Sequence, residues 1–320
     1  MNSVIVNRTE IVRGSKDEIQ SLTRAFLNGQ NVKESSRNLY SRTLKQFFVW
    51  VGRTQKALSD LTRVDILEYK GYLENELKLS PLSVCSYITA LRKFYEWTEA
   101  EKLYPNIARG VKNPPRTQTF EKGFLTDEKS SELLAHFEGV SLRDYAIVNL
   151  MLRTGLRTIE VIRANVGDII FNGEQRVLKV WGKGKTEGEK GKGLNFVVLT
   201  DKAYLPIKNY LEAARKGAKA GEPLFTSTSH QNSGQQLTTR TISRICKDGL
   251  KAIGLDSRKY TAHSLRHTTA SSLLEHGQGI NQVQQVLRHS SPITTQIYTK
   301  MKEKEIRLRN APEAALDNAF

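Results

Sequence analysis

The amino-acid sequence predicts a mainly α-helical protein with one small β-sheet, divided into a helical first domain and an α+β second domain. Three observations lead to this prediction. Residues 16–103 carry apolar side chains at helical spacing almost throughout. Residues 104–123 then interrupt the pattern with two adjacent prolines and no periodicity, which is typical of a linker. Only beyond it, within residues 124–320, do two short strand-like runs occur among further helical segments.

Three apolar stripes predict the helices of the first domain. Their spacings of three and four residues place each set on one helix face, which indicates a small bundle around these seams. Basic side chains lie off the seams, and they are candidates for contacts to a polyanion, although a basic helix face is as often simply solvated. The stripes are Tyr40, Leu44, Phe47, Phe48 and Val51, then Ile66, Tyr69 and Leu73, then Val84, Ile88, Leu91 and Tyr95, and the basic candidates are Arg42, Lys45 and Arg92.

The second predicted domain combines helices with one hairpin. The segments LTDEKSSELLAHF and SLRDYAIVNLMLRTGLRTIEVIRA have helical periodicity. RVLKVWGKG and LNFVVLT are typical of strands, and the Lys- and Gly-rich stretch between them predicts a β-hairpin with a long turn. Helices resume at Ala203, and one of them is YTAHSLRHTTASSLLEHG, which begins at Thr261 and is closed by Gly277.

The charge balance indicates a polyanionic partner. The chain of 320 residues carries 49 Lys+Arg against 33 Asp+Glu, a net charge of +16 with a sequence pI of about 9.7. Nucleic acid is the commonest partner of such a protein, whereas a merely basic protein without such a partner is the alternative.

Cysteine usage and hydropathy indicate the compartment. The two cysteines, Cys85 and Cys246, lie in different halves of the chain and provide neither a disulfide framework nor a thiolate metal site. The N-terminus MNSVIVNRTEIVRG lacks the apolar core of a signal peptide, and no apolar run is long enough to span a membrane. We therefore expect a cytoplasmic protein without a membrane partner.

One face of the helix that begins at Thr261 carries His263, Arg266 and His267. Histidines at i and i+4 can bind zinc, but the glutamate that follows the first histidine in metalloproteases is replaced by Ser264. The fixed charge of Arg266 would also repel a metal ion, so no metal site is predicted. A phosphate fits this face better, because a guanidinium can grip two phosphate oxygens and a histidine can exchange a proton near neutral pH.

Further residues of the same chemical kinds occur elsewhere in the second domain. Arg157 follows a glycine turn, with Glu160 one helical turn later, and Lys183 lies at the tip of the predicted hairpin. His289 precedes Tyr298 by nine positions. Taken singly, the tyrosine would be an ordinary packed aromatic and the lysine an ordinary loop residue, so only their joint presence indicates a site.

The segments TGLR, HSLRHTTAS and HSSPITTQIY resemble the motif boxes of the tyrosine recombinase (phage integrase) family, which includes the Xer-type recombinases and Cre. The resemblance covers nearly the whole chain. It implies an N-terminal helical, SAM-like core-binding domain over residues 16–103, a linker over 104–123, and an α+β catalytic domain with a C-terminal tail over 124–320.

The resemblance also implies a reaction, the cleavage and rejoining of DNA strands through a 3′-phosphotyrosyl intermediate. No metal, ATP or other cofactor would be needed, because two guanidiniums serve at the phosphate and the covalent link conserves the bond energy. The implied roles are Tyr298 as nucleophile, Arg157 and Arg266 as the arginine pair, His263 as proton acceptor, Lys183 as general acid and His289 as a residue bonding a non-bridging oxygen.

The chain departs from the family pattern at two places. Arg288 stands where the third box usually has glycine, which predicts a different local turn or DNA contact. The hairpin turn is long and rich in lysine, so Lys185 is an alternative to Lys183. Two other functions remain open, a type IB topoisomerase-like DNA-relaxing enzyme and a non-catalytic DNA-binding protein of the same fold.

The resemblance implies DNA contacts and an assembly. LTTRTISRICKDGL resembles the family helix that enters the major groove, so Arg240 is the candidate base reader. Partners are expected to be double-stranded DNA with specific recombination sites, further copies of the chain forming a tetramer on paired sites, and possible accessory DNA-bending proteins. The terminal segment 312–320 is too short to form a stable helix alone and is expected to dock on a neighbouring subunit, with a frayed end as the alternative.

Overall fold

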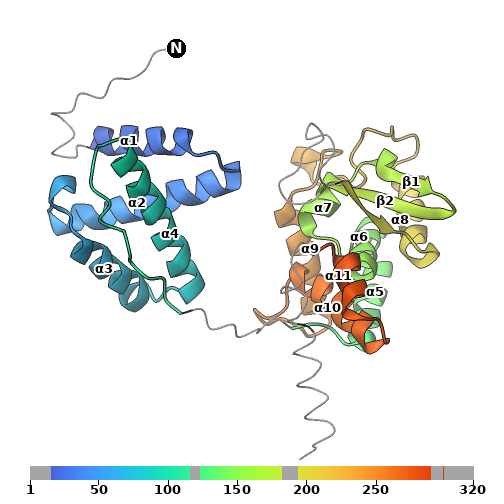
Figure 1. Ribbon diagram of the computed structural model, residues 1–320. Helices are drawn as coiled ribbons and strands as arrows, with labels where there is room; N and C mark the ends of the chain where they lie inside the picture. The colour runs from blue at the N-terminus through green and yellow to red at the C-terminus, as the bar shows by residue number, and fades with distance from the viewer. Residues whose placement is uncertain (1–15, 116–122, 182–193, 290–297, 299–320) are drawn as a thin grey trace, which may run out of the picture. The chain divides into compact units, whose positions relative to one another are not determined.

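The computed structural model describes residues 16–115, 123–181, 194–289 and 298. The chain divides into two compact units, residues 1–119 and 120–320 (Figure 1). Helices dominate both units, and the second also contains one three-stranded sheet, so the predicted fold class is confirmed. Within the described ranges, no helix is both long and apolar enough to cross a lipid bilayer.

In the described part of the first unit, residues 16–115, four α-helices surround a core rich in aromatic side chains. The three predicted apolar stripes lie in this core, with Phe47 and Tyr69 in edge-on contact at 5.0 Å between ring centroids. A short 3-10 turn follows the second helix and a π-helical turn follows the third. The elements are α1 (Lys16–Gly29), α2 (Glu34–Thr54), η2 (Leu58–Asp60), α3 (Arg63–Gly71), η3 (Tyr72–Glu76) and α4 (Pro81–Ala100).

Local sequence sets the start of α4 and the path that follows it. The Ser80 side chain accepts a hydrogen bond from the Ser83 amide, and proline at the first helical position lacks an amide that would be unsatisfied there. After α4, Ala108 and Val111 are buried in the helical core, so residues 104–115 of the expected linker pack as part of this unit. The glycine and prolines nearby are typical of a linker, so the sequence alone did not predict that Ala108 and Val111 are buried.

The second unit packs its helices around α6. Six consecutive residues of α6, from Ala146 to Met151, are buried, because the helix contacts α5, α8, α9 and α10 on different sides. The helices are α5 (Asp127–Glu138), α6 (Leu142–Thr154), α7 (Thr158–Arg163), α8 (Asp201–Ala214), α9 (Thr239–Ala252), α10 (Ala262–Glu275) and α11 (Ile280–Leu287), with 3-10 turns η4 (Val166–Asp168) and η5 (His230–Asn232).

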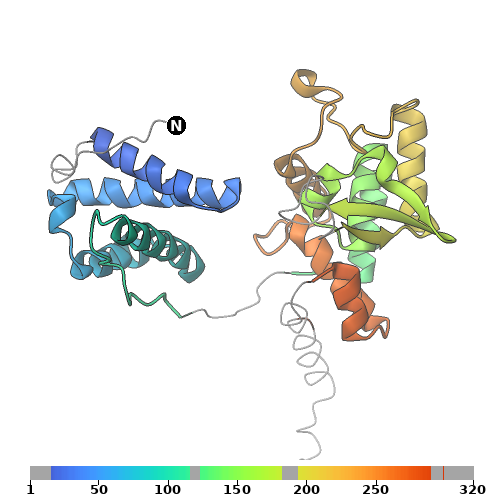
Figure 2. The ribbon, with the colours of Figure 1, turned by 45° about the horizontal axis from the view of Figure 1, so that its top comes forward.

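The sheet lies beside α8, away from α10 and α11 (Figures 1 and 2). Its antiparallel strands β1 (Ile169–Asn172), β2 (Gln175–Trp181) and β3 (Leu194–Val198) follow in chain order. The predicted hairpin is confirmed by the pairing of β2 with β3, in which Leu178 lies opposite Val197. β1 is an additional strand of only four residues, too short to show alternation. The hairpin turn with Lys183 and Lys185 lies outside the described residues.

A glycine turn joins α6 to α7 and places the first motif box. Gly155 has φ 60°, a left-handed conformation that disfavours side chains, and its amide donates to the Met151 carbonyl. A Cβ at this position would lie 2.5 Å from Cδ2 of the fully buried Leu287. Both the conformation and the close approach of α11 therefore require glycine here.

Gly155→Ala is expected to destabilise the protein more than Gly173→Ala, its matched control. Gly173 has φ 62° but no atom within 4 Å of its would-be Cβ, so both variants share the left-handed cost of ~1–2 kcal/mol. Only Gly155→Ala adds overpacking, worth a further ~1–3 kcal/mol. Denaturant unfolding measures the difference, and equal losses in the two variants would contradict the close approach of Leu287.

Candidate active site

Arg157 begins α7 and is fixed by a buried carboxylate. Glu160 accepts hydrogen bonds from the Arg157 amide at 2.8 Å and from its Nη1 at 2.9 Å. Burial alone would raise the pKa of Glu160, but the charge of Arg288 and the bonds from Arg157 outweigh it and lower the pKa. The carboxylate is therefore ionised, and it holds Arg157 while 30% of the arginine side chain remains exposed.

Arg266 is the most deeply placed cation of the site. It lies on α10, is buried, and donates from Nη1 to the Gly155 carbonyl and from Nη2 to the Leu287 carbonyl. These carbonyls lie at the ends of α6 and α11. The guanidinium of Arg266, in the segment HSLRHTTAS, therefore connects the turn of TGLR to the residues that lead into HSSPITTQIY. Burial, followed by the charges of Arg157 and Arg288, lowers its pKa to about 9, which leaves it protonated at neutral pH.

Tyr298 is buried against α10 and α11, with 4% of its surface exposed. Its hydroxyl lies 2.5 Å from Nδ1 of His267. Burial raises the pKa of Tyr298 to about 12, against the opposing effect of Arg266. A hydroxyl with this pKa is protonated at neutral pH, so its use as a nucleophile requires an acceptor for the proton.

The two histidines of α10 differ in their surroundings. His263 is exposed, whereas His267 is buried, and their rings meet edge-on at 4.7 Å between centroids. The sequence resemblance assigned a role to His263 alone. His267 is thus a site residue that the assignment missed, although its position on the same helix face as His263 and Arg266 was a signal.

His289 completes the cluster beside the tyrosine. Its ring is parallel to that of Tyr298, within 7°, at 6.4 Å between centroids. Burial, followed by the charges of Arg266 and Arg157, lowers its pKa to about 4. The imidazole is therefore neutral at pH 7. Arg157, His263, Arg266, His289 and Tyr298 all lie in one site, and Lys183 lies outside the described residues.

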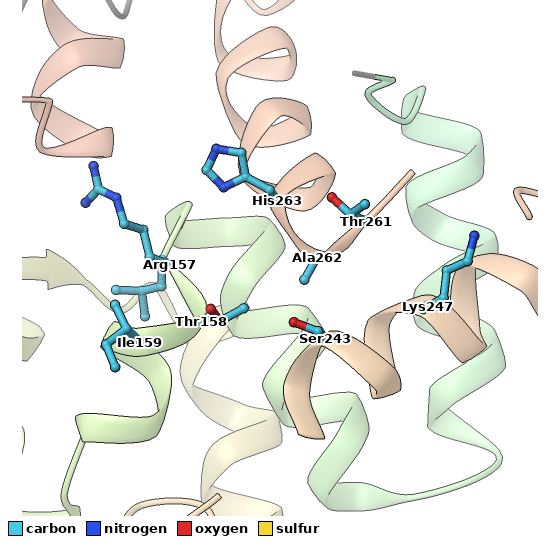
Figure 3. Close-up of a pocket in the computed structure, with 9 residues that line it drawn as sticks. Arg157, Thr158, Ile159, Ser243, Lys247, Thr261, Ala262 and His263 are labelled. Atoms are coloured by element: carbon cyan, nitrogen blue, oxygen red, sulfur yellow. The ribbon is translucent and has the colours of Figure 1, made fainter. Parts of the chain in front are cut away.

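A pocket of about 510 Å³ opens beside this cluster, between α7, α9 and the start of α10. Figure 3 shows Arg157, His263 and Lys247 extending toward its open side, with Thr158 and Ser243 below them. Arg157 and His263 thus line the pocket together with Lys247 and Ser243 of α9. A phosphate in this pocket would meet cations from two sides.

The residues expected to bind DNA lie in different surroundings. Arg42, Lys45 and Arg240 are exposed on α2 and α9, whereas Arg92 is partly buried and donates to Asn113 at 2.9 Å. On α9, Arg240, Arg244 and Lys247 follow at intervals that align them on one face. In the described part of the chain, no three His, Cys, Asp or Glu side chains come together as a metal site would need.

Comparison with known proteins identifies the family. Residues 123–305 match the Phage integrase family, and residues 19–104 match its N-terminal SAM-like domain. Tyrosine recombinase XerC of Leptospira interrogans is 30% identical over 312 residues, covering 94% of this chain and 96% of the relative. Tyrosine recombinase XerD of Vibrio cholerae is 26% identical over 298 residues, with coverage of 90% and 94%.

Solved structures agree in fold. The XerH site-specific recombinase bound to a palindromic difH substrate matches with a TM-score of 0.73 and 18% identity, covering 94% of this chain and 85% of that one. A lambda integrase dimer bound to a COC′ core site matches with a TM-score of 0.66 and 18% identity, with coverage of 85% and 95%. On the family match and the curated relatives, this chain belongs to the phage integrase family and is a tyrosine-type site-specific recombinase.

Proposed function

We propose that this chain breaks and rejoins duplex DNA at specific sites through a 3′-phosphotyrosyl intermediate, without metal or ATP. The observation that carries the proposal is the convergence on Tyr298 of a hydrogen-bonded imidazole and the charges of Arg157 and Arg266. A tyrosine needs a proton acceptor to become a nucleophile, and the attacked phosphate needs cations for its growing negative charge.

In the proposed step, the Oη atom of Tyr298 bonds to phosphorus and the bond from phosphorus to the 5′ oxygen breaks. Arg157 and Arg266 stabilise the added charge on the pentavalent phosphorane. His289, neutral at pH 7, donates a hydrogen bond to a non-bridging oxygen. The reverse attack by a 5′-hydroxyl of another strand rejoins the DNA, and the phosphotyrosyl link conserves the bond energy in between.

Proton transfer involves two histidines and a lysine. His267 holds the tyrosine hydroxyl before DNA binds, and His263, exposed in the pocket next to Arg157, accepts the proton once a phosphate is bound. The edge-on contact between the two imidazoles makes the required movement of the hydroxyl short. Lys183 of the hairpin turn, with Lys185 as the alternative, gives a proton to the leaving 5′ oxygen.

Double-stranded DNA with specific recombination sites is the proposed substrate. The net charge of +16 and the basic face of α9 favour it, and the similar XerH and lambda integrase structures are bound to DNA. We further propose a tetramer on two paired sites, with the terminal segment 312–320 docked on a neighbouring subunit. We also propose accessory DNA-bending proteins as additional partners and a cytoplasmic location, as the cysteine usage favours.

The test begins with a site selected from a randomised duplex pool by binding to the purified protein. A plasmid carrying two copies of that site is expected to recombine without metal or ATP. Relaxation of supercoils without recombination would instead favour a type IB topoisomerase-like enzyme. Binding without any strand cleavage would favour a non-catalytic DNA-binding protein and overturn the proposal.

Arg240 and Lys45 are expected to contribute to DNA binding in different ways. If Arg240 reads a base, Arg240→Ala relaxes specificity at one base pair by ~1–3 kcal/mol. If Lys45 contacts a phosphate, Lys45→Ala weakens binding to all sequences alike and reduces the salt slope by about one. Affinities for the selected site and its single-base variants over a salt series measure both. Equal, sequence-independent losses would refute this division.

A further inference from the structure

Arg288 occupies a backbone position that favours glycine. It follows Leu287 at the end of α11 with φ 54° and ψ 45°, the left-handed conformation in which helices commonly end on glycine. Among the described residues, three other non-glycine residues have positive φ, namely Gln55, Lys78 and Lys102, and all three are exposed. The side chain of Arg288 is only 6% exposed, so its charged group, unlike the side chains of these three residues, is kept inside the protein.

The buried guanidinium of Arg288 is bound within the protein. Nη2 donates to Oε2 of Glu160 at 3.0 Å, and Nη1 donates to the Val286 carbonyl at 2.6 Å. Nε has no hydrogen-bond partner among the described residues. A buried charge requires an opposite charge nearby, and the Glu160 side chain, 1% exposed, supplies it.

Glu160 is shared between Arg288 and Arg157. Oε2 accepts from the Arg157 amide and from Arg288, while Oε1 accepts from Nη1 of Arg157. The contact with Arg288 therefore holds one oxygen in place and leaves the other directed at the Arg157 guanidinium. Without Arg288, Oε2 would keep, among the described residues, only its bond from the Arg157 amide, and the carboxylate would be held by Arg157 alone.

The turn at Arg288 also lies next to a backbone carbonyl that binds Arg266. The left-handed turn at Arg288 ends α11, and the Leu287 carbonyl immediately before it accepts from Nη2 of Arg266. A third cation so close to Arg157 and Arg266 would repel both, but the ionised Glu160 offsets its charge. The turn and the shared carboxylate therefore hold Arg157 and Arg266 in place, while Glu160 offsets most of the repulsion that Arg288 would add.

We propose that Arg288 is a positioning residue of the recombination site, which orients Arg157 through their shared carboxylate, Glu160. It does not contact the DNA, because both terminal nitrogens are bound within the protein and the side chain is buried. The inference rests on the proposed function in so far as Arg157 acts on the phosphate. The orientation of Arg157 can nevertheless be measured without DNA.

The experiment compares Arg288→Gly with Arg288→Ala. Both remove the guanidinium, but only glycine removes the backbone strain, so the alanine variant is expected to unfold about 2–4 °C lower. If Arg288 positions Arg157, both variants lose the same factor, about tenfold, in the single-turnover rate of adduct formation on nicked suicide DNA. The Kd for that DNA is expected to change less than twofold, and Arg288→Lys, which retains a cation, is expected to regain part of the rate.

The pathway through Glu160 is tested by combination. In a Glu160→Gln background, Arg288→Gly is expected to cause almost no further loss of rate, because the shared carboxylate is already absent. Additive losses would overturn the proposal. So would rates that follow the unfolding midpoints, with Arg288→Gly near the wild type and Arg288→Ala well below it.

A DNA-free measurement separates this inference from the proposed function. In ¹⁵N NMR of the full chain, the guanidinium protons of Arg157 are expected to exchange faster with solvent in Arg288→Gly than in the wild type. Unchanged exchange would overturn the positioning role of Arg288. A wild-type protein that forms no adduct on bound DNA would overturn the proposed function, and the exchange measurement would still decide the inference.

Discussion

Tyr298→Phe is expected to abolish the covalent protein–DNA adduct while leaving DNA affinity within about twofold. The phenyl ring fills the same space between α10 and α11 but offers no oxygen to attack phosphorus. Loss of the hydrogen bond to His267 is expected to cost ~1 kcal/mol of stability, so the variant remains folded. Denaturing electrophoresis of a nicked suicide duplex carrying the selected site detects the adduct.

Tyr210→Phe is the matched control. Its hydroxyl is also buried in the second unit, where it bonds the Thr226 amide at 3.3 Å, but the ring lies against Phe225 in the main core. This variant is expected to lose comparable stability and to form the adduct normally. An adduct that survives Tyr298→Phe would mean that another residue is the nucleophile, and loss of the adduct in both variants would point to general destabilisation.

The fold was predictable where local pattern decides structure. Apolar residues recur at helical spacing along α2 and at strand spacing on both sides of the hairpin turn. Such a period predicts both the type of element and the face that it turns toward the core. Residues 104–115 were less predictable, since Ala108 and Val111 are buried by packing into the helical core of the first unit and show no periodicity of their own. Strand β1 is likewise specified by its pairing with β2 rather than by its own four residues.

The candidate site was predictable as a set of residue types but not as a set of contacts. The motif boxes led to Arg157, Arg266 and Tyr298, because each of these residues lies inside a short segment that resembles a family motif. The contact of His267 with Tyr298 spans 31 positions and depends on how Tyr298 packs on α10. The departure at Arg288 was visible in the sequence, yet its bond to Glu160, 128 positions away, required the folded structure.

Arg266→Lys is expected to reduce both the adduct rate and the stability, whereas Arg157→Lys is expected to reduce the rate alone. Both arginines are proposed to stabilise the phosphorane, and loss of such a donor typically costs ~3–4 kcal/mol of the barrier, a rate loss of about 10²–10³. Arg266 additionally bonds the Gly155 and Leu287 carbonyls. A lysine ammonium in its place cannot span both in the plane of a guanidinium, and a buried carbonyl left without its donor costs ~1–3 kcal/mol.

The comparison isolates the structural role of Arg266 from its proposed catalytic role. The Arg157 side chain is 30% exposed, and its replacement leaves Glu160 bonded to the Arg157 amide and to Arg288, so the free energy of unfolding is expected to stay near that of the wild type. Denaturant unfolding and single-turnover adduct assays on the same preparations supply both quantities. If Arg266→Lys were as stable as Arg157→Lys, the hydrogen bonds of Arg266 would not connect the ends of α6 and α11 in the way described. These two hydrogen bonds also set the position at which the Arg266 guanidinium meets the phosphate. We therefore expect Arg266→Lys to lower the rate of adduct formation more than Arg157→Lys does.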